Sequence, residues 1–230
     1  MWYNGALMLT RNRLSYLTLI LILALLTLTL PACEKQPAPA TPTATGPQLL
    51  LADDFDDPAS GWLEAADAEA SQGYRDGQFF FQVRAPDLIV WEDAGGNFED
   101  FVLEVSARQA SGAPENSYGV LLRYVDEGNF YRFDLTGDGS YAVLKLEQGE
   151  WQTLVDWQGS AHVRPLGEVN RIQAVCQGTR MTFYVNDQML DSVEDITFER
   201  GDVGLFVSTF AEPDVEVEFD DLEIWTTEHP

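Results

Sequence analysis

The residues best suited to chemistry are three carboxylates in the segment VEFDDLEIW, residues 217–225: Glu218, Asp220 and Glu223. Paired carboxyl groups cleave glycosidic bonds, one as a general acid and the other as a nucleophile or base. A retaining mechanism needs the two groups about 5–5.5 Å apart. On a regular strand Glu218 and Glu223 project to opposite faces, because successive side chains alternate. The two glutamates can therefore converge only if a β-bulge interrupts the strand.

The same segment also fits a structural strand that closes a sheet. Its apolar residues alternate on either side of a slip of phase at Asp220-Asp221, and they are Val215, Val217, Phe219, Leu222 and Ile224. Such a slip is itself typical of a bulge, so the pattern alone excludes neither interpretation. We favour the closing strand and predict no catalytic residue in the chain.

Short β-rich runs must position these residues, since no long helical periodicity occurs from Leu49 onward. Turn pairs such as Asp76-Gly77 and Asp138-Gly139 separate the runs, as expected of tight hairpins. The pattern predicts an all-β chain folded as an antiparallel jelly-roll β-sandwich. The expected strands are 49–55, 78–84, 88–91, 101–109, 117–125, 129–136, 140–147, 151–157, 169–177, 180–186, 188–194, 202–209 and 215–226.

Several of these runs also carry family-like landmarks, namely FDDP…GW, NFYRF, WQ…W, RIQAVCQG…MTFYVNDQ, GDVGLFV and VEFDDLEIW. Their order resembles the concanavalin A-like lectin/glucanase sandwich, in particular laminin-G-like and 3-keto-disaccharide hydrolase-type domains of bacterial lipoproteins. The spacing of Glu218, Asp220 and Glu223 resembles the catalytic motif of the family 16 glycoside hydrolases. Because this fold hosts lectins, hydrolases and adhesion modules alike, the resemblance implies a fold more than an activity.

The resemblance also implies that the first and last strands lie together, with calcium often bound nearby. Calcium takes several hard oxygen ligands. We therefore expect Asp54 and Asp56, near the first strand, to meet Asp221 near the last and to bind Ca²⁺. The alternative is that DDFDDPASGW, residues 53–62, is a loop rich in turn-forming residues.

Three basic residues in the centre of the chain are expected to converge. If residues 117–147 form three strands joined by tight turns, Arg123 lies opposite Arg132 with Lys145 beside it. Like charges that face each other are unfavourable unless they are neutralised, so one interpretation is a salt-bridge network. The other is a ligand surface, on which arginines bind carboxylates or hydroxyls and aromatic rings stack on a pyranose. The predicted ligand residues are Trp91, Arg123, Arg132, Asp134, Tyr141 and Lys145.

The N-terminal part of the sequence has the features of a targeting signal. Arg11 and Arg13 precede the apolar run 14–30, and LPAC follows with Cys33. This order is typical of a secretory signal, and the cysteine resembles the lipobox of bacterial lipoproteins. A transmembrane helix is the alternative, although the run is short for a span. We expect a signal peptide at 1–32, a lipidated Cys33 opening a Pro/Thr/Ala tether at 33–48, and the sandwich at 49–227.

The composition limits the classes of molecule that the protein is expected to bind. A formal net charge of −25 argues against nucleic acid and against adsorption to anionic lipid, so a lipid on Cys33 would be the membrane contact. With Cys33 lipidated, Cys176 has no partner and is expected in the core. The function expected is a non-catalytic glycan-binding or cell-surface interaction module on an extracytoplasmic, membrane-anchored lipoprotein. The alternatives are a 3-keto-disaccharide hydrolase-type enzyme and a structural or adhesion domain that contacts protein.

Overall fold

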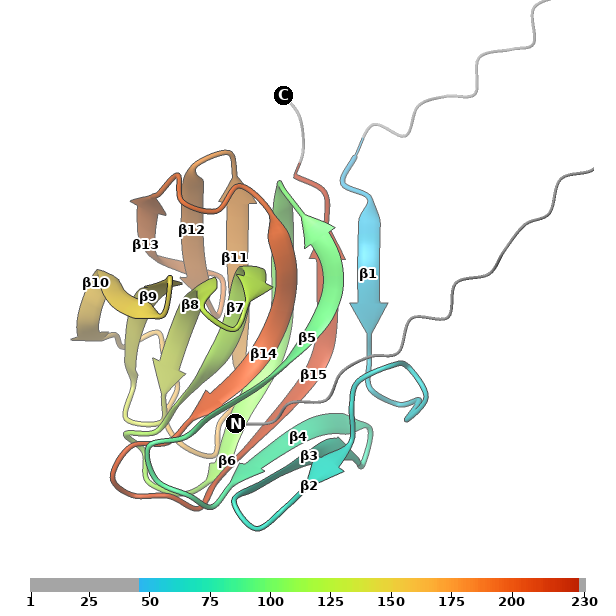
Figure 1. Ribbon diagram of the computed structural model, residues 1–230, viewed down its shortest axis with the longest axis vertical. Helices are drawn as coiled ribbons and strands as arrows, with labels where there is room; N and C mark the ends of the chain where they lie inside the picture. Colours follow the sequence, from blue (N-terminus) through green and yellow to red (C-terminus); the bar gives the residue numbers. More distant parts are fainter. Residues whose placement is uncertain (1–45, 228–230) are drawn as a thin grey trace, which may run out of the picture. The chain divides into compact units, whose positions relative to one another are not determined.

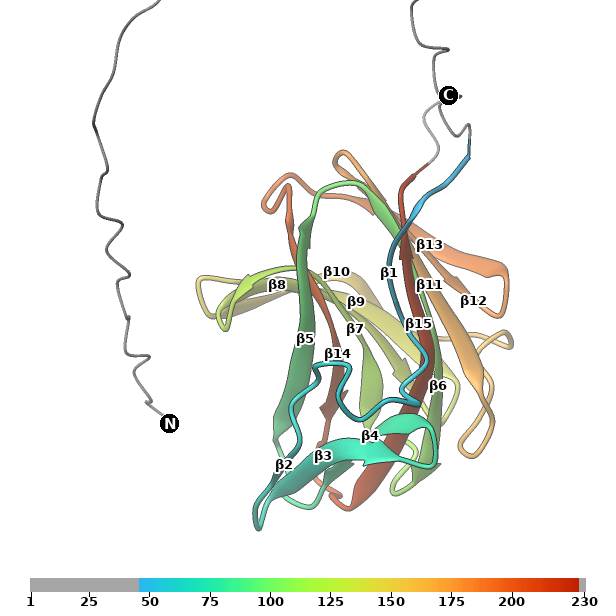
Figure 2. The same cartoon turned by 90° about the vertical axis from the view of Figure 1, so that its right-hand side faces the viewer.

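Alternation of apolar and polar residues in the β-rich runs gives two antiparallel sheets that pack face to face. The computed structural model describes residues 46–227, and Figures 1 and 2 show the two layers from the front and from the side. The predicted all-β sandwich is confirmed. Within residues 46–227 no helix is long and apolar enough to cross a membrane. The signal peptide, Cys33 and nearly all of the predicted tether lie outside the described residues.

The larger sheet, called sheet A below, has nine strands in the order β13-β12-β11-β6-β15-β4-β3-β2, with β1 also paired to β15. Its strands are β1 (Leu49–Asp53), β2 (Ala65–Ala66), β3 (Ala70–Arg75), β4 (Gln78–Val83), β6 (Phe101–Ser111), β11 (Asn170–Gln177), β12 (Arg180–Val185), β13 (Gln188–Glu194) and β15 (Val215–Trp225). Strands β2 and β3 were not predicted, because these segments lack an alternating apolar pattern.

The smaller sheet, called sheet B, has six strands in the order β10-β9-β8-β7-β14-β5. Its strands are β5 (Ile89–Phe98), β7 (Ser117–Asp126), β8 (Asn129–Thr136), β9 (Ser140–Glu147), β10 (Glu150–Gly159) and β14 (Gly201–Ser208). The core lies between the sheets, where for example Phe133 of β8 packs on Phe183 of β12 with ring centroids 4.8 Å apart. Cys176 is a fully buried member of this core, as predicted.

Strand β15 carries the bulge that its sequence predicts. Asp221 has a positive φ of 51°, and the pairing with β6 shifts between Asp220 and Glu223. On the side of β15 away from β6, the residues before the bulge pair with β4 and those after it pair with β1. The first and last strands therefore lie side by side, as expected (Figure 2). The bulge keeps apolar residues in the core on both sides of the slip.

A second bulge, in β7, was not predicted and moves Arg123 into the interior. Arg123 has φ 51° and only 1% of its surface exposed. Its guanidinium donates hydrogen bonds to the carbonyls of Phe198, Glu99 and Gly178, at 3.0, 2.9 and 2.7 Å. The arginine therefore ties the β5–β6 turn, the β11–β12 turn and the segment after β13 to β7. Its expected place opposite Arg132 is wrong, since Leu121 pairs with Arg132.

We predict that Arg123→Met lowers the free energy of unfolding by about 3 kcal/mol or more, measured by urea denaturation. The variant leaves three carbonyls without their donor, and each unpaired buried group costs about 1–3 kcal/mol. Arg180→Met is the matched control, because the Arg180–Glu194 pair is exposed and such pairs contribute at most about 1 kcal/mol. Equal losses in the two variants would contradict a structural role for Arg123.

Candidate functional site

The outer face of sheet B carries a row of aromatic side chains, named here the aromatic face: Trp91, Tyr124, Phe130 and Trp151. Phe130 lies at its centre, with ring centroids 6.4 Å from Trp91, 5.8 Å from Tyr124 and 5.8 Å from Trp151. These residues come from β5, β7, β8 and β10, so the row crosses the whole sheet. They surround a small apolar cluster of Leu121, Leu146 and Phe206, which is separate from the main core.

A buried ion pair lies within this face. Arg132 donates to both carboxylate oxygens of Asp134, with Nε 3.1 Å from Oδ1, and Ser117 Oγ donates to Asp134 Oδ2 at 3.0 Å. The guanidinium carbon lies 4.0 Å from the ring centroid of Phe206 and 5.2 Å from that of Trp151. Asp134 is fully buried and Arg132 is 3% exposed. The pair holds Arg132 in one orientation beneath the rim of Trp151.

The aromatic side chains over this ion pair are partly exposed. Trp151 is 46% exposed, and Trp91 and Tyr124 are partly exposed. Among residues 46–227, Arg132 Nη1 has no hydrogen-bond partner, whereas Nε and Nη2 are used by Asp134 and Ser117. The face thus offers exposed aromatic surface beside a fixed cationic group with one free nitrogen.

The other predicted ligand residues lie elsewhere. Lys145 lies on the inner face of sheet B, where its Nζ is 3.0 Å from Asp195 and 3.1 Å from Glu147. Tyr141 is on the same inner side, nearly buried, and donates to the carbonyl of Leu190 at 3.3 Å. The expected phase of β9 is therefore wrong, because apolar residues occupy both of its faces. Of the six predicted ligand residues, Trp91, Arg132 and Asp134 share the aromatic face.

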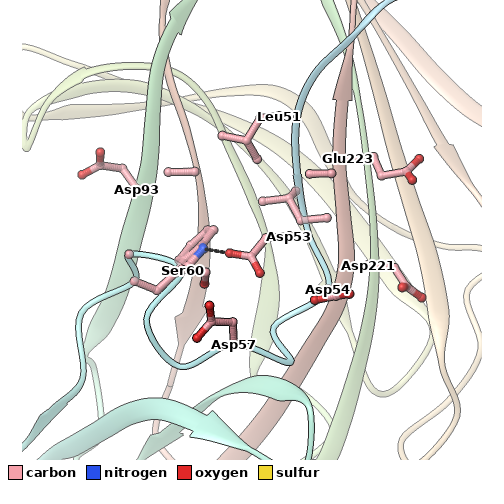
Figure 3. Close-up of a pocket in the computed structure, with 13 residues that line it drawn as sticks. Leu51, Asp53, Asp54, Asp57, Ser60, Asp93, Asp221 and Glu223 are labelled. Carbon is pink, nitrogen blue, oxygen red and sulfur yellow. Dashed lines mark hydrogen bonds between the residues drawn. The ribbon is translucent and has the colours of Figure 1, made fainter.

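A cavity beside β1 is lined by acidic residues (Figure 3). It measures about 650 Å³, and its acids are Asp53, Asp54, Asp57, Asp93, Asp221 and Glu223. Several of these carboxylates already serve the local chain: Asp53 accepts from Phe55 N at 2.8 Å and from Trp62 Nε1 at 2.9 Å. Such bonds are typical of turn-forming aspartates.

The predicted calcium ligands are only partly brought together. Asp54 and Asp221 line this acidic pocket, whereas Asp56 does not. Within the described part of the chain, no three histidine, cysteine, aspartate or glutamate residues form a group that could hold a metal ion. Calcium binding by Asp54, Asp56 and Asp221 stays a prediction of the sequence.

The carboxylate motif of β15 faces outward from sheet A. The bulge puts Glu218 and Glu223 on the same outer face, as the glycosidase interpretation required. Glu218, however, is held by Arg108, with Nε at 2.9 Å, and lies 3.6 Å from Arg75. Glu223 accepts from Trp225 Nε1 at 3.0 Å and lines the acidic pocket. Glu218 is not among the residues that line this pocket, so the two glutamates do not flank one common hollow.

Comparison with known proteins supports the fold and leaves the activity open. No protein-family model matches the chain, and no curated protein matches its sequence. Among solved structures, a protein of unknown function with a galectin-like fold from Bacillus subtilis has a TM-score of 0.60 and 8% identity, covering 79% of this chain and 97% of that one. A structure titled for endo-acting O-glycanases of the human gut microbiota has a TM-score of 0.56 and 10% identity, covering 78% and 100%.

A galactosidase gives a third comparison. The endo-β-galactosidase from Clostridium perfringens that releases GlcNAcα1-4Gal has a TM-score of 0.55 and 10% identity, and the match covers 81% of this chain and 65% of that one. At these identities the likeness shows the fold alone. The fold is thus that of a galectin-like sandwich, and no family model confirms the laminin-G or the 3-keto-disaccharide hydrolase type.

The hydrogen bonds around Lys145 and Asp195 predict how the stability of the fold depends on pH. Burial raises the pKa of Asp195, but hydrogen bonds from Tyr131, Thr197 and Lys145 outweigh it and lower the pKa to about 2. An ordinary aspartate titrates near pH 3.9, so the folded state binds this proton more weakly than the unfolded state. The resulting stabilisation is present above about pH 4 and is lost as the pH falls through 2.

We expect the stability difference between the wild type and Asp195→Asn to shrink as the pH falls from about 5 to 2. Urea denaturation at several pH values measures this difference directly. The amide keeps the shape of the side chain but cannot titrate, so other acidic groups affect both proteins alike. A difference that stays constant across this range would contradict the assignment.

Proposed function

We propose that residues 49–227 form a non-catalytic carbohydrate-binding module, and that the aromatic face of sheet B is its binding surface. The observation that carries the proposal is the exposed Trp151 ring beside Arg132, whose guanidinium is fixed by the buried Asp134. Sugar rings present an apolar face for stacking and hydroxyl groups at their edges for hydrogen bonds. The aromatic face offers a partner for each.

The outer face of sheet A differs in a way that supports this choice. Its side chains are joined by ion pairs, including Arg75–Glu216 at 2.7 Å and Arg171–Asp187 at 3.0 Å. Surface pairs of this kind are satisfied by each other and by water. On the outer face of sheet B the aromatic residues instead cover a buried ion pair, and much of the Trp151 side chain remains exposed to solvent. An exposed aromatic patch of this kind is typical of a binding surface.

The fold is compatible with such a role without specifying it. Proteins named for the release or breakdown of glycans are among the solved structures that share the sandwich. Fold likeness is an analogy, and the function must be argued from the site. Asp134, the carboxylate beside Arg132 within this face, is already bound by Arg132 and Ser117 and is not free to act on a glycosidic bond. Binding without cleavage therefore fits this face best.

We predict that Trp151→Ala weakens glycan binding at least tenfold, since about 1.4 kcal/mol of lost contact corresponds to a factor of ten. The measurement is a glycan and polysaccharide array with residues 46–230, followed by calorimetry on the best ligand. Trp225→Ala is the matched control, because Trp225 is a partly exposed tryptophan on the outer face of sheet A. Arg132→Met should weaken binding as well, through loss of the free nitrogen.

The outcomes separate the hypotheses. Folded protein that binds no glycan would overturn the proposal and favour a protein-contact or structural role. Equal losses in the Trp151 and Trp225 variants would show that sugar binds elsewhere. The array is run with calcium and with a chelator, and we expect no difference, because the acidic pocket does not include the aromatic face. Loss with the chelator would instead support calcium at Asp54, Asp56 and Asp221.

We further propose that a lipid on Cys33 holds the module at a membrane outside the cytoplasm. The support is the sequence order alone: basic residues, an apolar run, LPAC and a proline-rich tether. In a bacterial host the full chain should partition into the detergent phase, and Cys33→Ser should not, although both should be exported. Detergent-phase recovery of the Cys33→Ser variant would favour a transmembrane helix at residues 14–30.

A further inference from the structure

A second hollow lies on the outer face of sheet B, at the end where β8 turns into β9. It measures about 320 Å³ and is named here the end pocket. Its lining residues are Glu115, Thr136, Asp138, Ser140, Trp157 and Phe210. This volume is at the lower end of the range for small-molecule sites. The proposed function given above makes no use of it.

Two exposed aromatic residues form part of its wall. Trp157 of β10 and Phe210, which follows β14, are each 42% exposed. In the order of sheet B, three strands separate β10 from β14, and two of them, β9 and β8, supply Ser140 and Thr136 to the same hollow. The pocket therefore spans the sheet from one aromatic residue to the other, with hydroxyl groups between them.

The remaining lining groups are carboxylates with unused oxygens. Thr136 Oγ1 and Ser140 N donate to Oδ1 of Asp138 at 2.5 and 3.0 Å, which fixes the carboxylate. Among residues 46–227, Asp138 Oδ2 accepts no hydrogen bond, and the exposed Glu115 has no ion-pair partner. None of the described residues that line the hollow is a lysine, an arginine or a histidine.

Asp138 remains ionised at neutral pH. Burial raises the pKa of Asp138, but hydrogen bonds from Thr136 and Ser140 outweigh it, so its pKa lies below the ordinary value. The chain as a whole has a formal charge of −25. An anionic sugar in the end pocket would face like charges with no basic group to offset them. A cation would meet both carboxylates and aromatic rings, two groups that attract it.

We propose that the end pocket binds a hexosamine ring whose amine is free and protonated, as one unit of a glycan. The ring stacks against Trp157 or Phe210, and its ammonium group donates to Asp138 or Glu115. This inference rests on the proposed carbohydrate binding and names its ligand class. The ligand expected here is cationic rather than anionic, because Arg123 and Lys145 are already engaged elsewhere within the protein.

The end pocket and the aromatic face can serve one ligand. Arg132, Asp134 and Thr136 follow each other on the outer side of β8, since side chains alternate along a strand. Four residues of strand separate Arg132 from Thr136 by roughly 13 Å. Because this distance exceeds the length of one sugar unit, an oligosaccharide of several units can stack one ring on Trp151 and place another, further along the chain, in the end pocket.

The test compares a glucosamine oligomer with its fully N-acetylated form and with a uronic acid oligomer, by calorimetry on residues 46–230. We expect the free-amine oligomer to bind at least tenfold more tightly than the acetylated form, and the uronic acid oligomer not to bind. Asp138→Asn and Glu115→Gln should each reduce this preference. Trp157→Ala should weaken the free-amine oligomer, while Trp151→Ala should weaken both forms equally.

The controls separate a built site from attraction to an acidic protein. Glu194→Gln removes one exposed charge far from the pocket and should leave the preference unchanged. Equal effects of Glu194→Gln and Asp138→Asn, or equal affinity for the free and acetylated oligomers, would overturn the inference. If neutral glycans still bind and depend on Trp151, the proposed function survives that result. If no glycan binds at all, both fail together.

Discussion

The bulge that turns Arg123 inward is the constraint on which the arrangement of the molecule depends. Regular alternation after Leu122 would place Arg123 on the outer face of sheet B and Tyr124 in the core. The positive φ at Arg123 and the shift of register beyond Leu122 reverse this order. Arg123 then reaches the carbonyls at one end of the sandwich, and Tyr124 joins Phe130 on the aromatic face. One bulge in β7 thus places Arg123 where it bonds the loop carbonyls and places Tyr124 among the aromatic residues of the outer face.

Burying the charge of Arg123 costs free energy, and the groups around its guanidinium explain how the fold tolerates it. The nearest carboxylate, Asp100, lies 4.0 Å away, and Arg123 Nε has no hydrogen-bond partner among the described residues. Burying a charge without close pairing is unfavourable unless other dipoles stabilise it. Here three backbone carbonyls do so, and each belongs to a segment that has no ladder partner at that point. The same bonds satisfy the arginine and those carbonyl groups.

Sequence reasoning succeeded where only one face of a strand is buried and failed where both are. In β15 acidic residues alternate with apolar ones, so the slip at Asp220-Asp221 is visible and its bulge could be predicted. In β7 the run GVLLRYV is apolar on both sides, and in β9 Tyr141 and Ala142 are both buried. Periodicity gives no phase in such runs. The predicted convergence of Arg123, Arg132 and Lys145 failed for this reason, whereas the strands themselves were found.

The buried Arg132–Asp134 pair connects this energetics to binding. A buried ion pair is weak evidence for stability, because apolar residues of similar volume often serve equally well. Its effect here is geometric: bonds from Nε and Nη2 fix the plane of the guanidinium between Phe206 and Trp151. The desolvation of most of the arginine is then complete before a ligand arrives, and little side-chain motion remains to be lost. A surface that must present one fixed donor beside an aromatic ring gains affinity from such a pair, whereas a purely structural sheet face gains nothing from it.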